Sequence, residues 1–196
     1  MDKTIVIASG NEGKIREFRQ MLEPEGYKVL CLKDLPDPAE PEETGTTFQE
    51  NAVLKAKAVT DRYGLEAIAD DSGLCVAALN GEPGVQSARW MGHETPYSVK
   101  NSKLIELVEG SKDRSCYYAC AIAWTAPGAE PAVFYDTWNG EIATEPRGTN
   151  GFGYDPIFFL PELGITSAEM DPEMKNSCSH RAKALRKLER WLHETC

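Results

Sequence analysis

The amino-acid sequence predicts an α/β protein built on a mixed β-sheet, and three observations support this. Short apolar runs rich in β-branched residues alternate with longer segments of helical periodicity. Two helical segments begin with clear signals: Thr47 and Glu50 form a capping box, and Pro96 stands at the first helical position of the next. Two long runs at 115–125 and 131–138 are arranged like a hairpin, so we expect a mixed sheet rather than a purely parallel one.

The expected elements follow one another along the whole chain. We expect strands at 3–8, 27–32, 65–69, 73–79, 115–125, 131–138 and 157–160. We expect helices at 12–23, 47–63, 96–109 and 179–194. In the last helix the apolar residues Leu185, Leu188, Trp191 and Leu192 recur at helical spacing, which predicts a packed core face, with a dimer surface as the alternative. Residues 1–196 are taken as a single domain, with two lobes inside it as the alternative.

Composition and charge indicate which cellular compartment and which classes of binding partner to expect. No apolar run approaches the ~20 residues of a membrane span, and the start, with Asp2 and Lys3 before a strand, is not a signal peptide. The six cysteines, among them Cys178 and Cys196, contain no C-x-x-C pair, so we expect reduced thiols in a cytoplasmic protein without disulfides or a zinc site. The net charge of −10 argues against a nucleic-acid polymer or an acidic membrane as partner.

The first expected strand breaks into a loop that is suited to hold phosphate. The loop reads Ser9-Gly10-Asn11-Glu12-Gly13-Lys14 and leads into a helix. Glycines let the backbone approach a ligand, the first N–H groups of a helix lack partners within the helix, and the lysine adds positive charge. The spacing is not that of a Walker A motif. The alternative is a strand-to-helix turn without a ligand.

Two acidic stretches are candidates for metal binding and proton transfer. Glu42 and Glu43 precede the second helix, and Asp70-Asp71-Ser72-Gly73 follows the apolar residues 67–69. We expect the aspartates at a strand end, with the glycine in a tight turn. There, carboxylates bind a hard cation such as Mg²⁺ while one of them accepts a proton from water. The alternatives are an ordinary turn and, for the glutamates, a solvated acidic loop.

The C-terminal half holds candidates for binding a purine base. Gly148 to Pro156 contains Phe152, which could stack on a base, and Asp155, which could accept the N1–H of a 6-keto purine where adenine has a lone pair. Lys175 and the helix start Ser179-His180-Arg181 could contact a phosphate or a base oxygen. The alternatives are a wide loop that enters a buried strand and an unremarkable helix cap.

Six motifs in order resemble the inosine/xanthosine triphosphate pyrophosphatase family, and most closely its bacterial non-canonical purine triphosphate pyrophosphatases. The motifs are Ser-Gly-Asn-x-Gly-Lys, Glu-Glu-Thr-Gly-x-x-Phe-x-Glu-Asn-Ala, Ala-Asp-Asp-Ser-Gly-Leu, Gly-x-Pro-Gly-x-x-Ser-Ala-Arg, Gly-Phe-Gly-Tyr-Asp-Pro-Ile-Phe and Lys-x-x-x-Ser-His-Arg. The resemblance implies an elongated α/β fold with a cleft between two lobes, a homodimer and Mg²⁺ dependence. It also implies hydrolysis of inosine, deoxyinosine and xanthosine triphosphates (ITP, dITP, XTP) to the monophosphate and pyrophosphate.

The resemblance also implies roles for individual residues. It assigns the phosphates to Ser9, Gly10, Asn11, Glu12, Gly13 and Lys14, and further substrate contacts to Lys55, Ser72, Phe152, Gly153, Tyr154, Asp155, Lys175, His180 and Arg181. It assigns the metal to Asp71 with Glu42 or Glu43, and the water-activating base to Asp71; the residues alone leave Asp70 as the other candidate base. Many relatives have Thr where this chain has Ser9.

Two rival functions share part of this pattern. One is a related septum-inhibitor-type nucleotide pyrophosphatase that acts on modified pyrimidine or guanine nucleotides. The other is a non-catalytic nucleotide sensor that reports through its dimer. The sequence leaves open how guanine is excluded, the preference for ribose or deoxyribose, and the role of Cys178.

Overall fold

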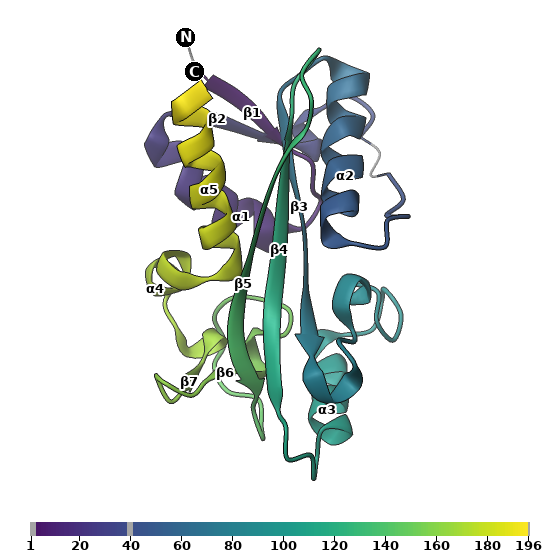
Figure 1. The fold of residues 1–196 in the computed structure, drawn as a ribbon, viewed down its shortest axis with the longest axis vertical. Coiled ribbons are helices and arrows are strands. Elements are labelled where there is room, and N and C mark those ends of the chain that lie inside the picture. The colour runs from purple at the N-terminus through teal and green to yellow at the C-terminus, as the bar shows by residue number, and fades with distance from the viewer. Residues whose placement is uncertain (1–2, 39–40, 196) are drawn as a thin grey trace. The chain divides into compact units, whose positions relative to one another are not determined.

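The computed structural model describes residues 3–38 and 41–195, and Figure 1 shows its helices and strands. Glu40 of the acidic stretch, Asp2 and Cys196 lie outside the described residues. Within the described ranges, no helix has both the length and the apolar character needed to cross a membrane.

Seven strands form one sheet in the order β2-β1-β3-β4-β5-β6-β7. The strands are β1 (Lys3–Ile7), β2 (Tyr27–Cys31), β3 (Ala67–Val76), β4 (Ser115–Thr125), β5 (Ala132–Ile142), β6 (Phe158–Leu160) and β7 (Ile165–Thr166). Strand β1 pairs in parallel with β2 and β3, whereas β6 pairs antiparallel with β5 and β7. The predicted mixed α/β sheet is therefore confirmed.

Five α-helices accompany the sheet in the described part of the chain. They are α1 (Glu12–Leu22), α2 (Phe48–Tyr63), α3 (Tyr97–Leu107), α4 (Pro172–Cys178) and α5 (His180–Thr195). Local sequence explains their starts: Asn11 caps α1 by accepting the N–H of Lys14, and Thr47 and Glu50 form the expected capping box of α2. Four of the five helices lie within two residues of their predicted bounds.

The sequence did not predict helix α4 or strand β7, and two strands that it predicted separately form one strand in the structure. Helix α4 has Asp171 as N-cap and Pro172 at its first position, but its seven residues are too few for a periodic pattern. Strand β7 has two residues. The expected strands at 65–69 and 73–79 are the single ten-residue strand β3, so the predicted tight turn at 70–73 is wrong.

The chain divides into two compact units by its internal contacts. Unit 1 comprises the residues up to 71, residues 120–136 and the residues from 181 onward; unit 2 comprises 72–119 and 137–180. The boundaries fall inside β3, β4 and β5, so each of these strands contributes residues to both units.

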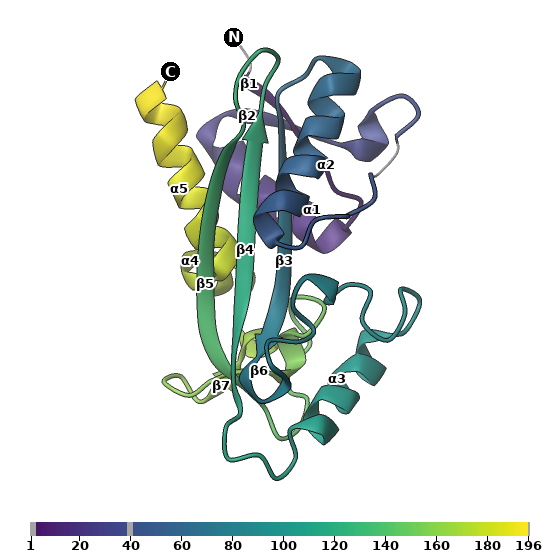
Figure 2. The same cartoon turned by 45° about the vertical axis from the view of Figure 1, so that its right-hand side comes forward.

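The core of unit 1 lies between its strands and the helices α1 and α5. Ile5 and Ile7 alternate toward this side, where they meet Phe18 of α1 and Leu185 and Leu188 of α5. Figures 1 and 2 show α2 on the opposite side of these strands from α5. The predicted core stripe of the last helix is confirmed, since its three leucines are buried, and its tryptophan packs half-buried at the edge.

The core of unit 2 is aromatic. Phe158 is fully buried and has Tyr118 at 4.5 Å and Trp138 at 5.0 Å between ring centroids. Leu74 of β3 and Leu104 of α3 complete the same cluster. This packing holds the segment that follows Gly148, where the base-binding candidates lie.

Candidate active site

The predicted phosphate loop lies at the junction of β1 and α1 in unit 1. Ser9 Oγ accepts the N–H of Asn11 at 3.1 Å, and Asn11 Oδ1 accepts the N–H of Lys14 at 3.1 Å, which together fix the turn. Glu12 and Gly13 are the first residues of the helix. The Lys14 ammonium lies 3.2 Å from a carboxylate oxygen of Asp70. The loop and the acidic pair therefore meet within unit 1.

Asp70 and Asp71 lie in the middle of β3 rather than at a strand end. Successive side chains of a strand point to opposite faces of the sheet, so the two carboxyl groups have different neighbours. A ten-residue strand that carries two buried carboxyl groups requires compensation on both faces. The two residues share the charges of Lys14 and Lys55 but have different hydrogen-bond donors, Arg181 for Asp70 and Asn51 for Asp71.

Asp70 is held by cations. Its Oδ2 accepts hydrogen bonds from Arg181 Nε at 3.2 Å and Nη2 at 3.1 Å and lies 3.2 Å from Lys14 Nζ. Burial alone would raise the pKa of Asp70, but Lys14, Arg181 and Lys55 outweigh it and hold the pKa well below the usual range. Its Oδ1 is buried and has no hydrogen-bond partner in the described part of the chain. Asp70 is therefore ionised at neutral pH.

Asp71 has the opposite electrostatic environment. Its Oδ2 accepts a hydrogen bond from Asn51 Nδ2 at 3.0 Å, and Lys55 Nζ lies 3.7 Å from its Oδ1. Burial raises the pKa of Asp71 and Glu43 adds to the rise, while Lys55, Lys14 and the hydrogen bond from Asn51 offset it only in part. A carboxylate that is more basic than usual can accept a proton from water.

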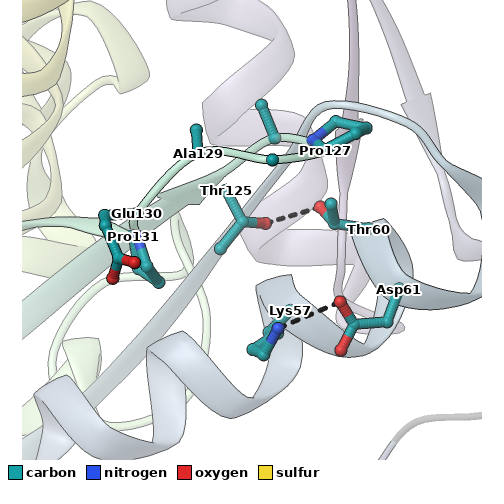
Figure 3. Close-up of a pocket in the computed structure, with 10 residues that line it drawn as sticks. Lys57, Thr60, Asp61, Thr125, Pro127, Ala129, Glu130 and Pro131 are labelled. Carbon is teal, nitrogen blue, oxygen red and sulfur yellow. Dashed lines mark hydrogen bonds and ion pairs between the residues drawn. The ribbon is translucent and has the colours of Figure 1, made fainter.

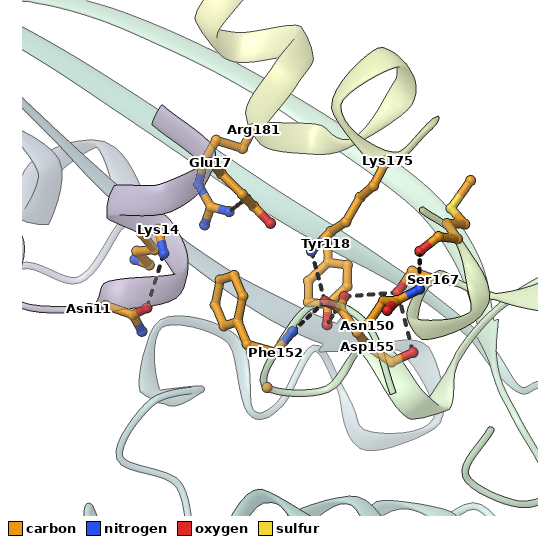
Figure 4. A network of polar contacts seen from close by, with 12 residues as sticks. Asn11, Lys14, Glu17, Tyr118, Asn150, Phe152, Asp155, Ser167, Lys175 and Arg181 are labelled. Atoms are coloured by element: carbon orange, nitrogen blue, oxygen red, sulfur yellow. Dashed lines mark hydrogen bonds and ion pairs between the residues drawn. The ribbon is translucent and has the colours of Figure 1, made fainter. Parts of the chain in front are cut away.

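Arg181 is buried among acids. Besides its contacts with Asp70, its Nη1 donates to the carboxylate of Glu17, which lies on α1 and is itself buried, as Figure 4 shows. The sequence predicted that Arg181 would reach a purine O6 or a phosphate. In this structure its guanidinium contacts the carboxylates of Asp70 and Glu17, because five donors in a rigid fork match carboxylate oxygens well. Its contact with substrate stays a prediction.

Lys55 connects the acidic loop to Asp71. Its ammonium donates to Glu43 Oε1 at 2.6 Å, in addition to its approach to Asp71. Glu42, by contrast, has an exposed side chain. Of the two glutamates that the sequence left open as metal ligands, Glu43 is the one whose carboxylate shares a cation with Asp71.

Asp155 and Lys175 form the polar centre of unit 2. Lys175 Nζ donates to Asp155 Oδ2 at 2.7 Å and lies 5.0 Å from the centroid of the Phe152 ring. The N–H of Phe152 also donates to Oδ2, at 2.9 Å, while the hydroxyls of Tyr118 and Ser167 donate to Oδ1 at 3.3 and 2.8 Å, as Figure 4 shows. The sequence proposed that Asp155 accepts a purine N1–H. Each carboxylate oxygen therefore has two donors within reach, although the single Ser167 hydroxyl proton can also go to the Asp155 carbonyl oxygen at 3.2 Å. The contact of Asp155 with a purine N1–H stays a prediction.

The other predicted site residues described in unit 2 contact aromatic rings and polar groups of the same unit. His180 is buried and stacks on Tyr118 with ring centroids 4.6 Å apart. Tyr154 is also buried, and its hydroxyl donates to the carbonyl of Ser87, so it belongs to the core. The carbonyl of Gly153 accepts from Asn101 Nδ2 at 3.2 Å.

A separate pocket of about 410 Å³ lies in unit 1 between α2 and the turn that joins β4 to β5, as Figure 3 shows. Lys57 and Asp61 form an ion pair at 3.0 Å on its wall, and the hydroxyls of Thr60 and Thr125 are hydrogen-bonded at 2.7 Å. The pocket is lined by none of the predicted site residues.

Comparison with known proteins decides the family. A family model described as the Ham1 family matches residues 5–191. The chain belongs to the Ham1 family. Among curated relatives, the dITP/XTP pyrophosphatase of Geobacillus kaustophilus is 50% identical over 192 residues, which cover 96% of this chain and 94% of that protein. The dITP/XTP pyrophosphatase of Nitrosomonas europaea is 48% identical over 192 residues, which cover 97% and 94%.

Solved structures agree with this Ham1 assignment. The Staphylococcus aureus Ham1 protein superposes with a TM-score of 0.89 at 43% identity and covers 99% of this chain and 100% of its own. A dITP/XTP pyrophosphatase from Mycobacterium abscessus superposes with a TM-score of 0.75 at 39% identity and covers 94% and 98%. The family resemblance and the α/β fold class read from the sequence are thereby confirmed.

The Ham1 chain has four polar residues in its network that the sequence did not mark as functional. They are Glu17, Asn51, Tyr118 and Ser167. Glu17 follows Lys14 by three residues, which places both on one face of α1, so helical spacing could have found it. Tyr118 and Ser167 carry no comparable signal, because only the tertiary fold brings them to Asp155.

The described part of this Ham1 protein brings few candidate metal ligands together. Among residues 3–38 and 41–195, no group of three or more His, Cys, Asp and Glu side chains is placed to hold a metal ion. Mg²⁺ in nucleotide enzymes uses one or two carboxylates together with substrate phosphates. The Lys55 ammonium lies 2.6 Å from a carboxylate oxygen of Glu43 and 3.7 Å from one of Asp71, so these two carboxylates already share a cation. The residues therefore fit Mg²⁺.

Proposed function

We propose that this Ham1 protein hydrolyses the non-canonical purine nucleoside triphosphates ITP, dITP and XTP to the nucleoside monophosphate and pyrophosphate. The observation that carries the proposal is the pair of adjacent carboxyl groups on β3, which have different partners: Arg181 and Lys14 contact Asp70, whereas Asn51 and Lys55 contact Asp71. The pKa values of the two groups are accordingly moved in opposite directions. Environments that separate two neighbouring carboxyl groups in this way assign them different chemical roles. The similarity to two dITP/XTP pyrophosphatases supports the substrate class.

Asp71 is the general base in this proposal. Its carboxylate takes a proton from water as the water oxygen bonds to the α phosphorus, and the bond from that phosphorus to the bridging oxygen breaks to release pyrophosphate. Asp70 takes the other role: its fixed negative charge holds Lys14 and Arg181 in place. Positioning and charge neutralisation supply most of the acceleration in phosphoryl transfer.

Asp71 and Glu43 would hold Mg²⁺, with Lys55 beside them. The bound ion would neutralise phosphate charge and make water more acidic. The N-terminal loop from Ser9 to Lys14 supplies N–H groups and a cation for the phosphates.

Lys175 and Phe152 are assigned to the base. The aromatic ring suits stacking on a purine, and the ammonium N–H donors suit the 6-keto oxygen of hypoxanthine or xanthine. Adenine carries an amino group at this position, which presents hydrogens instead of an acceptor. ITP is therefore favoured over ATP, while the exclusion of GTP requires a feature at C2 of the base.

We also propose that the protein acts in the cytoplasm as a homodimer. The six cysteines of the sequence contain no C-x-x-C pair, and this pattern supports a reducing compartment. The dimer rests on the family resemblance, and sedimentation velocity of the purified protein tests it directly.

The test of the activity is product analysis with matched variants. Wild type incubated with ITP and Mg²⁺ should release pyrophosphate rather than orthophosphate, and chelation of the metal should stop the reaction reversibly. Asp71→Asn should lower kcat by about 100-fold or more, the usual contribution of a general base. Asp61→Asn is the control, because Asp61 is an exposed carboxylate on α2. Orthophosphate as the product, or near-normal turnover by Asp71→Asn, would contradict the proposal.

A further inference from the structure

Asp155 is buried with a complete set of hydrogen-bond donors. It is 2% exposed, its Oδ1 accepts from Tyr118 and Ser167, and its Oδ2 accepts from Lys175 and the N–H of Phe152. A base N–H could be accepted only if one of these donors left. Hydrogen bonds to a charged group are worth more than ordinary ones, so the donors already on the carboxylate oppose such a replacement; the Ser167 hydroxyl has a second acceptor in reach, the Asp155 carbonyl oxygen at 3.2 Å.

The four donors come from separate segments of unit 2. Tyr118 lies on β4, Phe152 precedes the short helix that contains Asp155, Ser167 follows β7, and Lys175 lies on α4. A single carboxylate therefore fixes the two groups assigned to the base, Lys175 and Phe152, relative to each other. The 5.0 Å separation between the Lys175 ammonium and the Phe152 ring centroid shows the result.

Tyr118 makes a second contact with the predicted site. Its ring stacks on His180 with an interplanar angle of 11°, while its hydroxyl reaches Asp155. Burial raises the pKa of Tyr118, so the hydroxyl keeps its proton and remains a donor. One side chain thus contacts residues of two motifs that lie far apart in the sequence.

We propose that Tyr118 and Ser167 are positioning residues that act through Asp155, and that Asp155 influences base selection by holding Lys175 and Phe152 rather than by touching the base. This inference rests on the proposed function, since the selected base is that of the substrate. Its prediction for the removal of the Tyr118 or Ser167 hydroxyl is opposite to the one that follows if Asp155 contacts the base directly. Removing a hydroxyl would free a lone pair for a base N–H under direct contact, but under our proposal it loosens the two groups that bind the base.

The experiment compares Tyr118→Phe and Ser167→Ala with Tyr117→Phe and Ser98→Ala, whose parent residues are exposed. kcat and KM are measured for ITP and ATP, and thermal unfolding is followed for every variant. Each test variant should raise KM for ITP about 10-fold, the loss of about one hydrogen bond to a charged group, with little change in kcat. The ratio of kcat/KM for ITP to that for ATP should fall by a similar factor. Both controls should match wild type.

Calorimetric binding of IMP and AMP separates this inference from the proposed function. Wild type that binds IMP but releases no pyrophosphate from ITP would overturn the proposed function alone. Unchanged or tighter IMP binding in both test variants, with an unchanged ITP to ATP ratio, would overturn the inference and support direct contact by Asp155. If Tyr118→Phe fails to fold, Ser167→Ala, which deletes a single oxygen atom, decides the question.

Discussion

Replacing Asp70 by asparagine should destabilise the fold, whereas replacing Asp71 by asparagine should not. In Asp70→Asn, the negative charge that faces Arg181 at 3.1 Å and Lys14 at 3.2 Å is removed. Both cations then remain near β3 with one charged partner fewer. Removing one partner of a buried ion pair costs about 3–5 kcal/mol, and we take about 3 kcal/mol because the amide oxygen still accepts a hydrogen bond. For a chain of this size that corresponds to a fall in Tm of about 6–12 °C.

Asp71→Asn should not destabilise the fold. The pKa of Asp71 is raised in the folded state, so its ionised form is penalised at neutral pH by comparison with the unfolded chain. A neutral amide removes this penalty and can still accept the hydrogen bond from Asn51. We therefore expect a free energy of unfolding equal to or greater than that of wild type at pH 7, together with the loss of turnover described above.

Thermal and urea unfolding of the three proteins across pH tests both statements. Asp70 has a depressed folded pKa, so its contribution to stability is fully present above the ordinary aspartate value of 3.8 and is lost as pH falls below it. The gap between wild type and Asp70→Asn should therefore narrow below about pH 4. A Tm of Asp70→Asn within 2 °C of wild type, or an equal fall for Asp71→Asn, would refute this reasoning.

Two further predictions concern the neighbours of these carboxylates. Lys55 lowers the pKa of Asp71, so Lys55→Met should move the acid limb of the kcat/KM profile to higher pH; an unmoved limb in a pH–rate series would exclude this coupling. In Gly151→Ala, the new Cβ would lie 2.0 Å from Asp155 Oδ2 in addition to the strain of a positive φ. The free energy of unfolding should fall by about 3 kcal/mol, against about 1 kcal/mol for Gly128→Ala, whose positive φ faces open space. Equal losses in urea unfolding would show that the Asp155 carboxylate moves aside at little cost.

The sequence was sufficient for elements with strong local signals. The capping box of α2 and the apolar stripe of α5 are properties of neighbouring residues, and both are as predicted. The turn predicted at Asp70 was wrong because Asp, Ser and Gly favour turns only when the surroundings do not compensate them. Lys14, Arg181 and Lys55 supply that compensation from distant positions, which a local pattern does not contain.

The sequence indicated which residues are candidates for the site, but not which of their side chains contact one another. Residues of the phosphate loop, the acidic pair and the helix start at His180 could be marked from motifs. Which cation faces which carboxylate follows from side-chain direction, so the different surroundings of Asp70 and Asp71 required coordinates. The four donors on Asp155 required them as well, because they come from four segments.

Placing the acidic pair inside a strand has a chemical advantage over the predicted turn. In a turn, both carboxylates would face water and share similar pKa values. In β3, strand alternation directs Asp70 toward Arg181 and Lys14 and directs Asp71 toward Asn51 and Lys55. One residue step along the backbone thus gives the two carboxyl groups different neighbours. If Asp71 is the general base proposed above, a slip of β3 by one residue would exchange the two faces and should abolish turnover even if the sheet still formed.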